Sequence, residues 1–146
     1  MPLSGEYEPS GSAFSRRQVE LYESSGGTRG TTVDGVSVVV LTTVGSRSKK
    51  LRKTPVMRVE HGGCYAAVAS LAGAPRNPAW YHNLLAHPVA DLQDGAVKQN
   101  MTARELTGDE RALWWGRAVA VWREYADYQR KTERLIPVML LVPTIA

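Results

Sequence analysis

Five basic side chains fall within seven consecutive positions, at Arg47, Lys49, Lys50, Arg52 and Lys53. They lie in the stretch Leu41–Arg58, after an apolar segment and a glycine turn. Like charges packed this closely repel each other, and a bound polyanion relieves that repulsion. The cluster therefore predicts a site for a phosphate-bearing ligand, with a solvated basic loop as the alternative interpretation.

The other potentially reactive residues form no familiar catalytic pattern. His61, His82 and His87 lack the spacing of a metal site, and the chain has no nucleophile elbow, P-loop or dinucleotide fingerprint. We interpret the histidines as turn and helix residues and Cys64 as a buried, inert thiol. We expect no bound metal, and a cofactor must then supply any difficult chemistry.

One aromatic residue stands apart from those that fill helix faces. Trp80 follows a Gly/Pro loop in the sequence GAPRNPAWYHN, where Asn77 and Pro78 indicate the start of a helix. Backbone N–H groups at a helix start and an aromatic face nearby suit a flat, anionic ligand.

Length and composition favour one folded domain. The chain has 146 residues, of which 43% are hydrophobic and 22% charged, and its net charge is +4. The positive excess lies largely in the basic cluster, so it indicates a local anion site and not a nucleic-acid surface. A single cysteine excludes an intramolecular disulfide, and the N-terminal sequence lacks a signal-peptide pattern. We expect a cytoplasmic protein with at most a peripheral contact at the inner face of the membrane.

Hydrophobic patterning and turn residues predict the elements that must position these groups. Ser12 caps a helix through about Glu23, and Thr107 with Glu110 has the spacing of a capping box before a long helix. A further helical turn carries Tyr125 and Tyr128. Strands are predicted at Thr31–Asp34, Val36–Thr43, Thr54–Glu60, Cys64–Ser70, Val89–Gln93, Val97–Glu105 and Ile136–Val142.

The order of these elements favours a mainly β (α+β) fold. The strands around Val36–Ser70 read as a three-stranded meander, and Asp94-Gly95 reads as a hairpin turn. Helices do not regularly separate the strands, so an antiparallel barrel with peripheral helices is preferred over a parallel sheet. We expect an N-terminal arm and helix over residues 1–30 and the barrel over 31–146.

Three segments together resemble one protein family. They are TTVGSRSKKLRKTP, ASLAGAPRNPAWYHNLLAHP and YADYQRKTERLIPV, in that order along the chain. In this combination they are similar to the deazaflavin (F420)-dependent nitroreductase family of actinobacterial flavin/deazaflavin oxidoreductases. The resemblance implies an FMN-binding-like split β-barrel that holds coenzyme F420, an 8-hydroxy-5-deazaflavin, between barrel and helices.

The resemblance also implies which residues bind the cofactor. Its phosphate and polyglutamate tail would meet Arg47, Lys49, Lys50 and Arg52. The deazaflavin would lie along residues of two strands, one loop and the short helix: Pro55, Met57, Ala67, Ala69, Ser70, Gly73, Ala74, Pro75, Trp80 and Asn83. Trp122, Tyr125 and Tyr128 would line the substrate pocket.

The activity implied is hydride transfer from reduced F420 to an electron-poor acceptor, such as a quinone, an activated alkene or a nitroaromatic. Ser70 and Tyr125 are the candidates for polarising the acceptor or donating a proton, and packing roles are the alternative for both. An FMN-dependent oxidoreductase of the same fold and a non-catalytic cofactor-binding protein remain alternatives. Monomer and homodimer both stay open.

Overall fold

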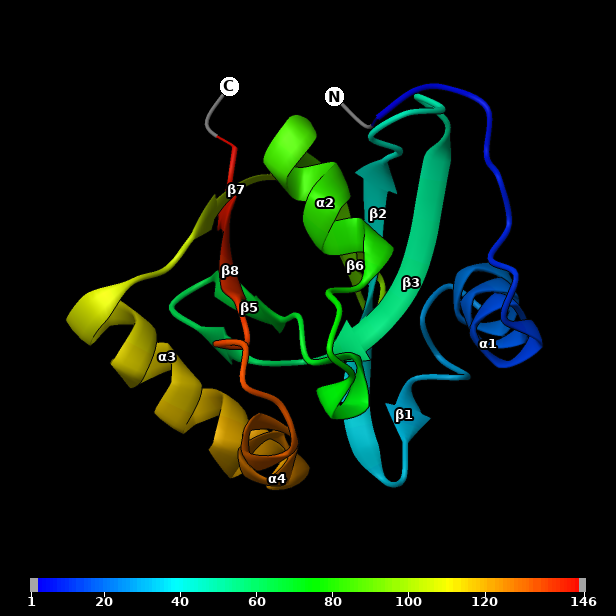
Figure 1. Cartoon of the computed structure of the whole chain (residues 1–146). Helices are drawn as coiled ribbons and strands as arrows, with labels where there is room; N and C mark the ends of the chain where they lie inside the picture. Colours follow the sequence, from blue (N-terminus) through cyan, green and yellow to red (C-terminus); the bar gives the residue numbers. More distant parts are fainter. Residues whose placement is uncertain (1–2, 145–146) are drawn as a thin grey trace.

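The computed structural model describes residues 3–144, and its centre is one curled antiparallel sheet of eight strands (Figure 1). The predicted arm-and-helix segment (residues 1–30) includes residues 1–2, and the predicted barrel (31–146) includes residues 145–146. These four residues lie outside the described part of the chain. The elements, in chain order, are α1 (Ala13–Ser24), β1 (Thr32–Val33), β2 (Val36–Val44), β3 (Leu51–Met57), β4 (Glu60–His61), β5 (Cys64–Val68), a short turn at Leu71–Gly73, α2 (Ala79–Ala86), β6 (Val89–Asp94), β7 (Val97–Glu105), α3 (Gly108–Val121), α4 (Glu124–Lys131) and β8 (Val138–Pro143).

The strand order is β1-β2-β6-β7-β8-β5-β4, and β3 pairs with β2. Every pair of strands is antiparallel. The sheet curls around a core that includes Leu41, Tyr65, Met101 and Leu141, and Leu84 of α2 reaches into this core. Helix α2 covers the opening of the curl, while α3 and α4 lie on one side and α1 on the other (Figure 1). The predicted split barrel with peripheral helices is thus confirmed.

Strand β2 is buried on both faces, as its β-branched run predicted. Val39 and Leu41 face the barrel core, whereas Val38 and Val40 pack against Val19 and Tyr22 of α1. Alternate side chains of a strand point to opposite faces, so two hydrophobic layers on either side produce a continuous apolar run. Helix α1, capped by Ser12 as predicted, therefore closes the outer face of the sheet.

The predicted meander is wrong. Strand β5 pairs with β8 and with β4, and it makes no ladder with β3. Strand β3 also begins at Leu51 and runs through Pro55, instead of starting near Thr54. A proline is tolerated there because β3 pairs along the sheet only with β2 and is an edge strand. The consequence is that Arg52 and Lys53 lie in a strand and project to opposite faces.

One predicted helix start and one predicted capping box differ from the structure. Helix α2 begins at Ala79 with Pro78 as its cap residue, and α3 has Thr107 at its cap position without a side-chain hydrogen bond. Glu110 makes no capping box because its carboxylate binds Arg104 through two hydrogen bonds of 2.7 Å. A bidentate pair with arginine competes well with a single bond to the backbone.

No helix within residues 3–144 is long and apolar enough to cross a membrane.

Tyr22 fastens α1 to the sheet through its hydroxyl. The side chain is 1% exposed, and the hydroxyl accepts a 2.7 Å hydrogen bond from the Gly95 amide in the β6–β7 turn. We expect Tyr22→Phe to lower the free energy of unfolding by about 1–3 kcal/mol, because the buried amide loses its acceptor. Tyr7→Phe is the matched control, since the buried Tyr7 hydroxyl has no hydrogen-bond partner within residues 3–144. Urea unfolding of both variants measures the difference, and equal losses would contradict this role for Tyr22.

Candidate functional site: a groove between barrel and helices

A cavity of about 680 Å³ lies between β3, the loop before α2, α2 itself and the C-terminal helices. The residues before and at the start of α1 close one side of it, through Ser10 and the largely exposed Phe14. Ligand pockets for drug-sized molecules typically occupy about 300–1,000 Å³. The groove therefore has room for a large planar ligand.

Many of the residues predicted for the site do line this groove. The cofactor candidates on its wall are Arg52, Pro55, Met57, Ser70, Trp80 and Asn83, and all three substrate candidates are there: Trp122, Tyr125 and Tyr128. The other cofactor candidates lie outside the wall: Arg47, Lys49, Lys50, Ala67, Ala69, Gly73, Ala74 and Pro75. Ala67 and Ala69 have no exposed surface, so their side chains belong to the sheet interior.

The basic cluster is largely paired with acidic groups. Lys50 lies 3.8 Å from Glu6, Arg52 lies 2.8 Å from Glu8, and Lys53 pairs with Glu23. Lys49 Nζ is 3.0 Å from Nε2 of His87 at the end of α2. Arg47 is exposed and contacts no other charged group within residues 3–144. The cations are thus spread from the groove wall to the open turn.

Arg76 is a candidate that the sequence analysis missed. It lines the groove, is exposed, and makes no ion pair with any residue between 3 and 144. Its place in GAPRNP, directly before the Asn-Pro that precedes α2, was the available signal. Arg52 and Lys53 also line the groove, but they pair with Glu8 and Glu23, so Arg76 is the groove cation that makes no ion pair with the described residues.

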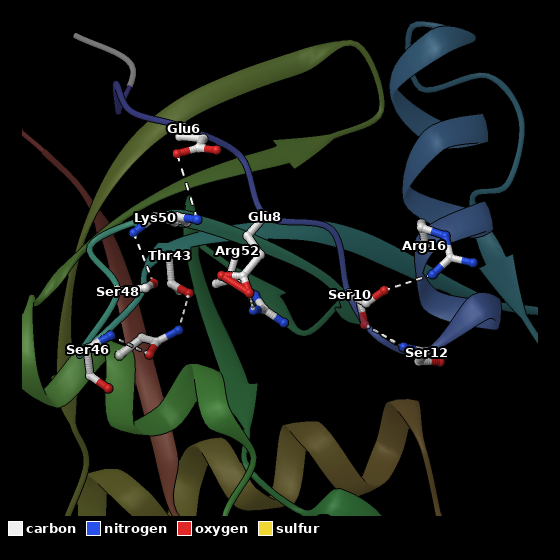
Figure 2. Close-up of polar contacts among 11 residues, drawn as sticks. Glu6, Glu8, Ser10, Ser12, Arg16, Thr43, Ser46, Ser48, Lys50 and Arg52 are labelled. Carbon is white, nitrogen blue, oxygen red and sulfur yellow. Dashed lines mark hydrogen bonds and ion pairs between the residues drawn. The ribbon is translucent and has the colours of Figure 1, made fainter.

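Asn83 holds the basic turn in position. Its side-chain oxygen accepts a 2.9 Å bond from the Ser46 amide, and its nitrogen donates over 3.0 Å to the Thr43 hydroxyl. Thr43 lies near the end of β2, and Ser46 lies in the turn that follows (Figure 2). Asn83 is 5% exposed, and it fixes α2 to the strand end while one edge of it lines the groove.

Arg134 organises the loop between β5 and α2. Its guanidinium donates to the carbonyl oxygens of Ala69, Ser70 and Ala74 at 3.1, 2.8 and 2.9 Å, and to Asn77 Oδ1 at 2.7 Å. Asn77 therefore serves as an acceptor for Arg134 and not as a helix cap. Because five donors in a rigid plane reach several acceptors at once, one arginine can hold the whole loop.

The loop needs this support because its backbone is strained. Leu71, Ala72 and Gly73 have φ values of 43°, 54° and 82°, in the left-handed region. For a residue with a Cβ atom this conformation costs roughly 1–2 kcal/mol. A Cβ on Gly73 would lie 2.9 Å from the Tyr128 carbonyl oxygen, so the glycine lets the turn approach α4 closely. The turn places Ser70 and Leu71 on the groove wall.

Tyr125 and Ser70 both contribute to the groove wall and are nearly buried. Tyr125 is 5% exposed and Ser70 is 8% exposed, and neither hydroxyl has a hydrogen-bond partner within the described residues. Burial raises the pKa of the Tyr125 phenol, with a smaller contribution from the neighbouring Tyr128. The phenol therefore stays protonated at neutral pH and can donate a hydrogen bond to a ligand.

Aromatic side chains form much of the remaining wall. Trp80 belongs to α2, and Trp122 follows the last residue of α3. The rings of Tyr125 and Tyr128 pack edge to face, with 6.2 Å between their centroids. No group of histidine, cysteine, aspartate and glutamate within residues 3–144 could hold a metal ion. The wall can thus stack flat rings and donate hydrogen bonds, and the arginines Arg52 and Arg76 can bind an anion.

We expect Arg134→Lys to lower the free energy of unfolding by roughly 1.5–3 kcal/mol, because a lysine cannot reach the four acceptors at once. Urea unfolding measures the loss. Arg130→Lys is the control, since Arg130 forms only an exposed pair with Asp127 at 2.9 Å. Similar small changes in both variants would show that Arg134 does not hold the loop.

The sequence model of F420H(2)-dependent quinone reductases matches residues 14–143. An F420H(2)-dependent quinone reductase of Mycobacterium tuberculosis is 32% identical over 125 residues, which cover 83% of this chain and 84% of the relative. Residues 14–143, which the family model matches, include the three segments that carry the resemblance.

Two solved structures are similar as well. One is described as an F420-H2 dependent reductase, FDR-A, with 50% identity, a TM-score of 0.68, and coverage of 71% of this chain and 92% of that one. The other is described as a domain-swapped dimer, with 46% identity, a TM-score of 0.71, and coverage of 86% of this chain and 95% of that one.

Proposed function

The chain belongs to the F420H(2)-dependent quinone reductase family, and from this membership we propose that it is an F420H2-dependent oxidoreductase whose acceptor is a quinone or another electron-poor ring. The reduced deazaflavin, when bound, supplies the hydride. The observation that carries the proposal is the groove, where aromatic walls, unpaired hydroxyls and cations converge.

The residues present fit a deazaflavin with an anionic tail. The groove is about 680 Å³, and Trp80 with the face of β3 at Pro55 and Met57 offers apolar surface for a tricyclic ring. Arg52 and Arg76 line the same cavity and can hold a phosphate, while Lys49, Lys50 and Arg47 lie farther along the basic turn. We propose these residues as the cofactor site.

The acceptor would lie against Trp122, Tyr125 and Tyr128. A quinone or nitroaromatic ring can stack on these aromatic side chains. The Tyr125 hydroxyl is the proposed donor to an acceptor oxygen, and the Ser70 hydroxyl is a second one. An activated alkene would fit the same wall, so the acceptor class is wider than quinones.

FMN is the alternative cofactor, since a single phosphate could bind the same arginines. The charge of the site favours the longer anion. Arg47, Lys49, Lys50, Arg52 and Arg76 are more cations than one phosphate can contact, whereas an acidic tail can follow them along the turn.

The proposal includes three further expectations, which concern the localisation, the division of the chain and the oligomeric state. We place the enzyme in the cytoplasm with at most peripheral membrane contact, and we keep residues 1–30 as an arm and helix attached to a barrel of residues 31–146. The relative described as a domain-swapped dimer supports the homodimer among the two assemblies left open.

We expect F420 to bind with micromolar affinity or better in a fluorescence titration, in a salt-sensitive manner, and FMN to bind more weakly. Arg52→Ala with Lys50→Ala should weaken F420 binding about tenfold or more, because two charge-assisted contacts are lost. Arg104→Ala removes an exposed cation far from the groove and is the control. Preference for FMN would assign the protein to the FMN-dependent oxidoreductases of the same fold. Failure to bind either cofactor would refute the proposal.

Tyr125→Phe should lower turnover roughly 100-fold with little change in F420 affinity, because only the proton donor is removed. The pKa of Tyr125 is raised above its usual value of 10.0, so the donor keeps its proton as pH rises and is lost only above pH 10. Turnover of a quinone followed from neutral pH to pH 10 should accordingly show no fall due to this group. Unchanged turnover in the variant would assign Tyr125 to packing, and no turnover in the wild type would favour a cofactor-binding protein.

A further inference from the structure

The segment Glu6–Glu8, which we call the acidic strap, lies along the free edge of β3 near the basic turn (Figure 2). The Leu51 amide donates to the Glu6 carbonyl over 2.7 Å, and the Glu8 amide donates to the Leu51 carbonyl over 2.9 Å. Tyr7 and Leu51 form an isolated parallel bridge. Backbone pairing thus sets the register of the strap against β3.

This register brings both strap carboxylates to cations of the basic cluster. Glu6 lies 3.8 Å from Lys50, and Glu8 binds Arg52 at 2.8 Å. Figure 2 shows Glu6 and Glu8 above β3, with Lys50 and Arg52 directed toward them. Arg52 also lines the groove, as does Ser10 just beyond the strap. An anion entering the groove along β3 would therefore meet cations that are already paired.

Both ion pairs are exposed enough to be exchanged. The side chains of Arg52 and Glu8 are 36% and 41% exposed, and those of Lys50 and Glu6 are 43% and 74% exposed. Exposed pairs of this kind contribute little to stability. The backbone bonds of the strap do not depend on the carboxylates, so these can release their cations while the strap stays in place.

We propose that Glu6 and Glu8 are specificity-determining residues, which compete within the molecule with the anionic end of the ligand for Lys50 and Arg52. The inference rests on the proposed function and adds to it. A ligand with a short anionic end can leave at least one of the two pairs intact. A polyanionic ligand must displace both carboxylates, so the strap reduces the advantage of additional negative charge.

The test compares F420 carrying a long polyglutamate tail with F420 trimmed to a single glutamate. Fluorescence titrations use the full chain, the single variant Glu8→Gln and the double variant Glu6→Gln with Glu8→Gln. Glu110→Gln is the matched control, because it breaks an exposed 2.7 Å pair with Arg104 and changes the net charge equally, away from the groove. Thermal unfolding confirms that each variant is folded.

Glu8→Gln should bind the long-tailed cofactor about two- to fivefold more tightly, which is the range that an exposed ion pair supplies. The double variant should bind it more tightly still. The gain should be smaller for the single-glutamate form and absent in Glu110→Gln. Equal affinity of Glu8→Gln and the wild type for the long-tailed form would overturn the inference, as would an equal gain in Glu110→Gln.

Inorganic tripolyphosphate separates this inference from the proposed function. Its binding is measured by calorimetry in the same variants. If F420 fails to bind at all, the proposed function is wrong, and the strap is judged by tripolyphosphate alone. Tighter binding to Glu8→Gln than to the wild type and Glu110→Gln then supports competition by the strap, and equal binding refutes it.

Discussion

The structure depends on the insertion of β8 between β5 and β7. Val138–Leu141 pair with Tyr65–Val68 on one side, and Met139–Pro143 pair with Met101–Glu105 on the other. Without β8, the strands β1, β2, β6 and β7 would be joined to β4 and β5 by no ladder. The same insertion brings the residues before β8, including Arg134, against the loop after β5, so closure of the sheet also builds the groove.

A second feature of the molecule is the pairing of its basic residues with acidic ones. The basic turn would repel itself, and the chain relieves this with three acids from two segments: Glu6 and Glu8 of the strap and Glu23 of α1. The two strap pairs are more exposed than the partly buried Lys53–Glu23 pair, and attraction between exposed charges is weakened by water and salt. The turn is therefore stable without a ligand and remains open to exchange with one. Arg76, which lines the groove, has no such partner among the described residues.

The interior of the groove needs little reactive chemistry of its own. Its aromatic walls bind flat rings, its arginines bind an anion, and its hydroxyls can orient an acceptor. This is the division of labour expected when a cofactor carries the hydride. The left-handed turn at Leu71–Gly73, held by Arg134, shows where the chain accepts strain in order to shape the wall.

The sequence by itself determined those features that depend on residues close together along the chain. The Ser12 cap, the β6–β7 hairpin and the doubly buried β2 are patterns within short segments that the structure bears out, and the family model confirms the resemblance carried by three such segments. Only the tertiary structure decided that β5 pairs with β8. It also decided the hydrogen bond from Arg134 to the Ser70 carbonyl, 64 positions away in the sequence, and the ion pair between Glu8 and Arg52, which are 44 positions apart. The tertiary structure also placed Arg76 on the groove wall, where it makes no ion pair with the part of the chain that is described. Hydrogen bonds and ion pairs between distant segments form only once the sheet has closed, because closure sets which carbonyls and charges face each other, and no local pattern records that geometry.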